Sequence, residues 1–214
     1  LRAGWPLDPE LSETLPLQSL LSLAQARSTV EMRLMNLSTA AGVDLLAQAP
    51  RRPLASVSWW HLLADSGNLH PTEEGWRLRP SLGTPADRLG LIAGLEQRLL
   101  TAVAVHHLPL DAEEQLLPLD QRRAGVAGHG ARHGLVLPLL WQELVEGRGW
   151  SVELLWQSLS WGGSELLGLP PEQLSLGTRR WLLFDPQHPW SWERGESLSM
   201  AANQPRLGQS VCGA

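Results

Sequence analysis

The stretch that decides the fold is TPADRLGLIAGLEQRLLTAVAVHH, residues 84–107. Thr84 is a typical helix N-cap, and Asp87 lies in the first turn, where a negative charge is favoured. Residues 84–100 are therefore predicted to form a helix. Residues 101–107 are apolar as far as the two histidines, as expected of a buried strand in a parallel sheet.

The same alternation extends toward the N-terminus. The segments ASVSWWHLL (residues 55–63) and STVEMRLMNL (residues 28–37) have strand patterns. Residues 38–49 predict a short helix between them, capped by Ser38 or Thr39, and the leucine-rich residues 12–26 predict another. Strands that alternate with helices indicate parallel βα units. Only about three units are present, whereas a complete eight-stranded barrel needs roughly 200 to 250 residues.

The C-terminal part is less regular. Residues 108–134 are rich in Pro, Gly and His and predict a long loop. Residues 135–147 and 151–167 predict two further helices, and RRWLLFDP (residues 179–186) predicts a last strand before an irregular tail. The first residue is Leu1, and we expect the chain to be a segment of a longer protein.

Composition narrows the function classes. The chain has 214 residues, a net charge of −5 and no long block of one charge, so we expect neither a nucleic-acid nor an anionic-membrane partner. No apolar run reaches the ~18 residues of a membrane span. Cys212 is the only cysteine, which excludes an internal disulfide and indicates a cytoplasmic protein. All 17 basic residues are arginine, so the chain contains no lysine for Schiff-base, P-loop or carbamylated-lysine chemistry.

Four stretches, in the same order and spacing, resemble dihydroorotases and their hydantoinase and allantoinase relatives. MNLSTAAGV (residues 35–43) resembles the strand-end motif His-(Leu/Val)-Ser-Thr-Ala, and SWWHLL (residues 58–63) resembles Thr-Pro-His-His-Leu-Leu. AVHHLPL (residues 104–110) resembles Ala-Thr-Asp-His-Ala-Pro-His. Residues 167–186 resemble the segment in which the family's chain leaves its barrel. The tryptophan-rich sequence, as in LLWQELVEGRGW (residues 139–150), is most similar to diverged dihydroorotase-like proteins of cyanobacteria.

This resemblance implies an α/β fold, the C-terminal portion of a (βα)8 TIM-type amidohydrolase barrel. Residues 1–170 would form the partial barrel, and residues 171–214 an incomplete return to a small β-sandwich domain. The family uses a divalent metal, zinc, to activate water against a cyclic amide such as dihydroorotate in pyrimidine biosynthesis. The resemblance also allows association with another pyrimidine-pathway enzyme, and we expect that partner or a homo-oligomer.

The residues at the matched metal positions depart from the family. Asn36 stands where the family has a histidine ligand, and an amide oxygen is a poor substitute for imidazole at zinc. His106 stands where the family has an aspartate that is both metal ligand and general base. His107 matches the family's next histidine. We therefore expect zinc binding to be weak or absent.

The substrate positions are also altered. The stretch Arg79–Gly83 corresponds to the family's Asn-Pro-Pro-Leu-Arg, so that its Asn and its Arg are missing. In SWWHLL, His61 matches the second histidine of the family motif. The loop GVAGHG, residues 125–130, resembles the family's substrate-side loop. We assign four residues to the candidate pocket: His61, Arg79, His107 and Gly128.

Several groups of residues have both a functional and a purely structural interpretation. His129 and His133, four residues apart, could join the two strand-end histidines in a new metal site, but surrounding glycines favour solvated loop histidines. Asp111, Glu113 and Glu114 are interpreted as a solvated helix start rather than paired catalytic acids. Four tryptophans in apolar helical contexts are expected to serve packing rather than base stacking: Trp141, Trp150, Trp156 and Trp161.

The sequence leaves three possible classes of function for the protein. One is an active dihydroorotase-like hydrolase. The second, which the substitutions at residues 36 and 106 favour, is a catalytically degenerate homologue that acts as a binding or scaffolding subunit. The third is an amidohydrolase with a rebuilt metal site and another cyclic-amide substrate.

Overall fold

The computed structural model describes residues 8–118, 121–128, 134–173, 175–179, 182–193 and 199–214. Its centre is a parallel sheet of three strands in the order β1 (Arg33–Leu37), β2 (Leu54–Ser58) and β3 (Ala102–Ala104). The predicted parallel neighbours are thus confirmed. The strands are shorter than predicted because the chain turns at Trp59 and runs irregularly from Val105.

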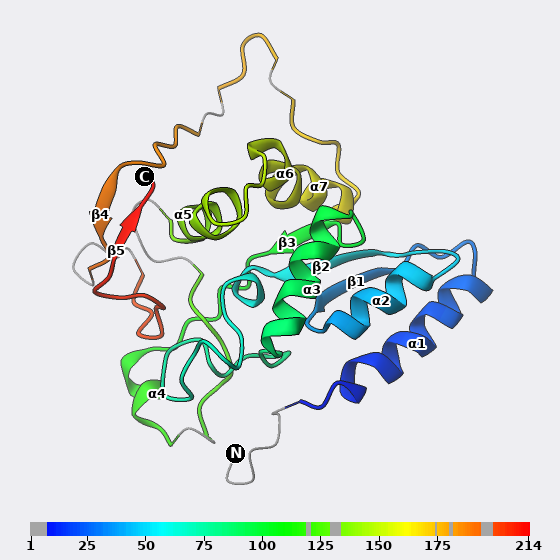
Figure 1. Ribbon diagram of the computed structural model, residues 1–214, viewed down its shortest axis with the longest axis horizontal. Coiled ribbons are helices and arrows are strands. Elements are labelled where there is room, and N and C mark those ends of the chain that lie inside the picture. Colours follow the sequence, from blue (N-terminus) through cyan, green and yellow to red (C-terminus); the bar gives the residue numbers. More distant parts are fainter. Residues whose placement is uncertain (1–7, 119–120, 129–133, 174, 180–181, 194–198) are drawn as a thin grey trace.

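Three helices in the N-terminal half follow the prediction. They are α1 (Leu11–Ala26), α2 (Ala40–Gln48) and α3 (Pro85–Glu96), and α2 and α3 lie together over one face of the sheet, with α1 beside α2 (Figure 1). The Thr39 hydroxyl caps α2, and Thr84 forms a capping box with Asp87 at the start of α3. Ser12, the first residue of the predicted helix at 12–26, lies inside α1 and donates to the Pro9 carbonyl.

The C-terminal half begins with a loop that contains one short helix, α4 (Ala112–Leu116), which Asp111 caps as expected of a solvated helix start. Residues 135–147 form α5 (Val136–Leu140) and a π-helical turn (Trp141–Glu146). Residues 151–167 form α6 (Val152–Trp156), a second π-helical turn (Gln157–Trp161) and α7 (Gly162–Leu167). None of these helices, nor any other in the described ranges, is long and apolar enough to cross a membrane.

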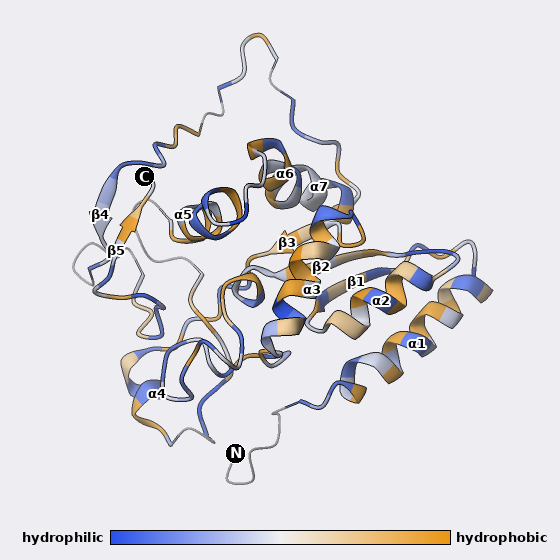
Figure 2. Ribbon diagram, viewed as in Figure 1, coloured by the Kyte–Doolittle hydropathy of each residue, from blue (hydrophilic) through white to orange (hydrophobic). Residues whose placement is uncertain are grey.

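The hydrophobic core includes residues of the three parallel strands and of α2, α3 and α5, whose ribbons carry hydrophobic residues in Figure 2. Trp59 and Trp192 are its largest fully buried side chains, and Trp150 is also buried, so several tryptophans do serve packing. Trp161 departs from the expectation, since 37% of it is exposed. The closest approach of backbones is at Gly162, where a Cβ atom would lie within van der Waals overlap of the Thr101 carbonyl oxygen.

The predicted last strand is wrong for the part of it that the structure describes. Arg179 and residues 182–186 form no strand; Leu182 and Leu183 are largely exposed, although Asp185 exchanges two backbone hydrogen bonds with Ala214 just beyond β5. A small antiparallel sheet forms further on, from β4 (Pro189–Ser191) and β5 (Ser210–Cys212). The chain does leave the parallel sheet after α7, as predicted. The division into domains at residues 170 and 171 stays a prediction.

Candidate functional site

Asn36 occupies an irregular position near the end of β1. The register between β1 and β2 shifts between Leu34 and Leu37, and Asn36 has a φ of 60°, the left-handed conformation that asparagine tolerates better than most residues. Its backbone N–H donates to the buried Ser56 hydroxyl, at 3.2 Å, rather than to a backbone carbonyl of β2. A bulge of this kind re-aims the side chain at the carboxyl end of the strand.

The Asn36 side chain meets His106. The distance from Asn36 Oδ1 to His106 Nε2 is 2.7 Å, and both residues are half-buried. His106 lies two residues beyond β3, so the contact crosses the carboxyl ends of all three strands. The imidazole donates its Nε2 proton to the amide oxygen, and that nitrogen then has no lone pair for a metal. The residues at the two positions that match metal ligands of the family therefore hydrogen-bond to each other.

His61 is held just beside this pair, in the 3-10 turn Trp59–Leu62 that follows β2. The ring is 3% exposed, and its Nε2 lies 3.1 Å from the Ser81 carbonyl oxygen, which can only accept. Nε2 therefore carries the proton, and the buried Nδ1 presents a lone pair that has no partner among the described residues. Burial lowers the pKa of His61, and the charge of His106 lowers it further, whereas hydrogen bonds to Ser81 and Pro80 raise it. The ring is neutral at pH 7.

The other residues assigned to the candidate pocket are tied less closely to Asn36, His61 and His106. Gly128 is buried beside Trp59, where an added Cβ atom would come within 3.3 Å of the indole nitrogen and 2.8 Å of Val105. His107 is half-buried, and Arg79 is exposed at the surface. His129 and His133, proposed as alternative ligands, lie outside the described residues. The structure thus brings Asn36, His106 and His61 together and leaves Arg79 at the periphery.

The side chains at the strand ends do not make a metal centre by themselves. A zinc site requires about four ligands from His, Cys, Asp and Glu, at least three of them from the protein. No group of three or more such side chains with suitable spacing occurs within the described ranges. The amide of Asn36 and the imidazole of His106 are a weaker donor set than the imidazole and carboxylate that the family resemblance implied.

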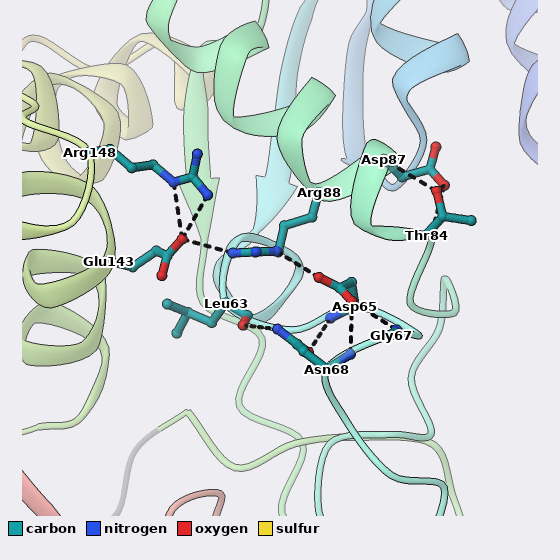
Figure 3. Close-up of polar contacts among 9 residues, drawn as sticks. All are labelled: Leu63, Asp65, Gly67, Asn68, Thr84, Asp87, Arg88, Glu143 and Arg148. Atoms are coloured by element: carbon teal, nitrogen blue, oxygen red, sulfur yellow. Dashed lines mark hydrogen bonds and ion pairs between the residues drawn. The ribbon is translucent and has the colours of Figure 1, made fainter.

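One structural feature that the sequence did not suggest is a set of charged residues beside the site (Figure 3). Arg88 of α3 donates from Nε to Asp65 and from Nη1 to Glu143, both at 2.8 Å. Arg148 donates to the same oxygen of Glu143 at 3.0 Å. Asp65 also accepts from the backbone amides of Gly67 and Asn68. This charged network joins the loop after the 3-10 turn to α3 and to the π-helical turn after α5; the Asp-Ser-Gly-Asn turn was its only sequence signal.

A second missed residue is Glu13 of α1. Its carboxylate accepts hydrogen bonds from the backbone N–H and the hydroxyl of both Ser38 and Thr39, at 2.5–3.2 Å. Asp87 accepts from the next amide, Ala40 N–H, at 2.9 Å. Two carboxylates therefore satisfy the free amides at the start of α2. Ser38 and Thr39, which belong to the motif MNLSTAAGV, therefore have a structural role in this chain.

A cavity of about 1280 Å³ lies away from the strand ends, between α6, α7 and the segment that follows them, with Trp156, Trp161 and Leu182 among its lining residues. No histidine or cysteine is among the described residues that line it. We therefore place the candidate site by the chemistry of Asn36, His61 and His106 rather than by cavity size.

Comparison with known proteins shows which proteins the chain resembles. No protein-family model matches the chain. The chain is 36% identical over its whole length to a probable dihydroorotase-like protein of Synechocystis sp., a cyanobacterium, of which it covers 48%. It is 32% identical over 96% of its length to a dihydroorotase-like protein of Pseudomonas aeruginosa, again covering 48%. A dihydroorotase of Listeria welshimeri is 26% identical over 99% of the chain, which covers 50% of it. The chain therefore spans about half the length of these curated relatives.

Solved structures show the same fold. An L-hydantoinase from Arthrobacter aurescens superposes with a TM-score of 0.79 at 20% identity, over 97% of this chain and 47% of that protein. The inactive dihydroorotase-like domain of a multifunctional protein from Chaetomium thermophilum superposes with a TM-score of 0.58 at 18% identity, over 92% of this chain and 51% of that one. At this level of identity the likeness shows a shared partial barrel.

Proposed function

We propose that this chain, which corresponds to the C-terminal half of a dihydroorotase-like protein, is part of a cyclic amidohydrolase that has lost its catalytic chemistry and serves as a binding or scaffolding subunit. The family reaction is the reversible, metal-dependent hydrolysis of a cyclic amide, with dihydroorotate as the substrate in dihydroorotases. Under this proposal the protein keeps the fold of the family but does not catalyse its reaction.

The hydrogen bond between Asn36 and His106 carries this proposal. Hydrolysis by the family mechanism needs a carboxylate that takes a proton from metal-bound water. His106 stands at that position and directs its Nε2 proton at Asn36, so this nitrogen is neither an anion nor a free lone pair. Loss of a general base alone typically lowers a rate by ~10²–10⁴-fold. The weakened ligand at residue 36 would lower metal affinity as well.

A scaffolding role has support from one structural neighbour. The dihydroorotase-like domain of the Chaetomium thermophilum multifunctional protein is described as inactive, and it shares the partial barrel of this chain. That domain is joined to other activities within one multifunctional chain. By analogy, the partner of this protein would be another enzyme of pyrimidine biosynthesis or a second copy of itself.

The test is hydrolysis by the purified full-length protein. Ring opening of dihydroorotate would be followed with zinc added and with zinc removed by a chelator. We expect no zinc-dependent rate above background. The paired variant Asn36→His with His106→Asp restores both family residues, and we expect it to bind zinc more tightly than the natural protein.

Zinc-dependent ring opening by the natural protein, abolished both by chelator and by His106→Ala, would overturn the proposal. That outcome would make His106 a working ligand. Stoichiometric zinc without dihydroorotate hydrolysis, but with hydrolysis of another cyclic amide, would instead establish the alternative of a rebuilt metal site.

A further inference from the structure

Residues 201–205, in the chain between β4 and β5, are irregular in backbone but buried. Ala201, Ala202, Asn203 and Gln204 are all less than 8% exposed, and Asn203 is fully buried. Irregular segments usually lie on the surface because their backbone groups need water. A buried irregular segment must therefore find its hydrogen-bond partners within the protein.

The Asn203 side chain supplies these partners to the loop that follows β3. Its Oδ1 accepts from the Leu110 amide at 2.8 Å, and its Nδ2 donates to the Leu108 carbonyl at 2.9 Å and to the Gly125 carbonyl at 3.1 Å. The Asn203 carbonyl also accepts from the Ala127 amide at 3.2 Å. A single buried amide thus bonds to both arms of the loop.

The two arms pack closely where Asn203 joins them. The Leu108 amide donates to the Val126 carbonyl at 3.1 Å, and an added Cβ atom on Gly125 would meet the Leu108 side chain at 2.5 Å. Leu108 lies two residues after His106, and Val126 lies two residues before Gly128. The ends of the loop that carry candidate site residues therefore start from the point that Asn203 holds.

We propose that Asn203 is a positioning residue for the strand-end site, in that it fixes the loop arms from which His106 and Gly128 project. The assignment rests on the proposed function only for the choice of that site. Asn203 touches none of the three site side chains; it acts through the backbone of Leu108, Leu110 and Gly125.

The test compares two substitutions of Asn203 with a control, in the full-length protein. Asn203→Ala removes all three side-chain hydrogen bonds, and Asn203→Asp keeps the shape and the acceptor for Leu110 but loses both donated bonds. Val211→Ala is the matched control, because Val211 is buried in β5 and its loss weakens the same C-terminal segment without touching the loop. Backbone amide exchange and the ring ¹H–¹⁵N signals of His106 would be measured by NMR.

For Asn203→Ala we expect exchange at Leu110, whose amide loses its acceptor, to rise by about tenfold more than exchange in β2, since a buried bond is worth roughly that factor in local opening. The His106 ring signals should shift because the contact with Asn36 is lost. Asn203→Asp should give the same shift with less effect at Leu110, and it carries the test if Asn203→Ala does not fold. Val211→Ala should raise exchange evenly and leave the His106 signals in place.

A purely structural role for Asn203 predicts another pattern. If the His106 signals stay unchanged in both Asn203 variants, or shift as much in Val211→Ala, the positioning role is wrong. These outcomes are independent of zinc-dependent hydrolysis, so a failure of the proposed function would not be confused with a failure of this inference.

Discussion

The Asn36–His106 pair and the charged network around Arg88 are both polar clusters at the ends of strands and helices, yet they are built in opposite ways. The pair consists of two side chains with no carboxylate, joined by one hydrogen bond. In the network, Asp65 is 3% exposed as a side chain and accepts from two backbone amides and a guanidinium, while Glu143 accepts from two arginines.

The difference shows at which positions this chain has buried carboxylates. A buried carboxylate is costly unless several donors surround it, and the network meets that condition while it holds three elements together. At the strand ends, where the family resemblance implied an aspartate and a metal, His106 replaces the carboxylate and hydrogen-bonds to Asn36. The carboxylates of the network are thus surrounded by donors, whereas the strand-end pair contains no carboxylate.

The largest expected effect comes from breaking the network. Arg88→Leu leaves the Asp65 carboxylate buried without its guanidinium, and removal of one partner of a buried ion pair typically costs about 3–5 kcal/mol. We expect a loss in that range in the free energy of unfolding, measured by urea denaturation. A loss below about 1 kcal/mol would mean that the backbone amides alone satisfy Asp65, and the contrast with the strand-end pair would fail.

The next effect is a pH dependence that belongs to the strand-end side of the comparison. Folding lowers the pKa of His61, mainly through burial, so the unfolded chain binds a proton more readily than the folded one. The stability that the neutral ring provides is present above pH 6.5 and is lost as the pH falls below that value toward the folded pKa. Thermal unfolding between pH 7.5 and 5 would show this, and His61→Gln should flatten the slope. An equal slope in both proteins would exclude His61 as its source.

A smaller effect is expected from the pair itself. Asn36→Gly removes the hydrogen bond to His106 without strain, because glycine adopts a φ of 60° freely. One half-buried hydrogen bond between side chains is worth about 0.5–1.5 kcal/mol, so the loss of unfolding free energy should be well below that of Arg88→Leu. If the two losses were equal, the pair would be as important to stability as the network.

The smallest effect is expected at the edge of the network. The side chains of Arg148 and Glu143 are 27% and 30% exposed, and Glu143 keeps Arg88 when Arg148 is removed. Arg148→Ala should therefore cost less than about 1 kcal/mol, as partly exposed ion pairs do. A double-mutant cycle with Arg88→Leu would reveal any stronger coupling between the two arginines.

The sequence was most informative where local signals were strong. Thr84 and Asp87 located α3, Thr39 located α2, and the strand–helix alternation predicted the parallel order of β1, β2 and β3. These features depend on neighbours within a few residues. The segment at residues 179–186 has a strand pattern but forms no strand in its described part, because a pattern alone does not determine how a segment pairs.

Long-range contacts explain what the sequence missed at the site. Asn36 and His106 are 70 residues apart, and nothing in either motif indicated that they would bond to each other. The links from Glu13 to the start of α2 and from Asn203 to the loop after β3 join residues 25 and about 95 positions apart. The resemblance placed Asn36, His61 and His106 at the ends of adjacent strands, but only packing decided which of them would touch.

Zinc titration by calorimetry, with the purified full-length protein, tests the central claim most directly. The account predicts no tight binding by the natural protein, because the Asn36 amide and the His106 Nε2 proton are committed to each other. It predicts stronger binding by the variant that carries both Asn36→His and His106→Asp. Tight stoichiometric zinc in the natural protein that disappears in His106→Ala would contradict the account, because it would show that His106 leaves Asn36 to hold a metal.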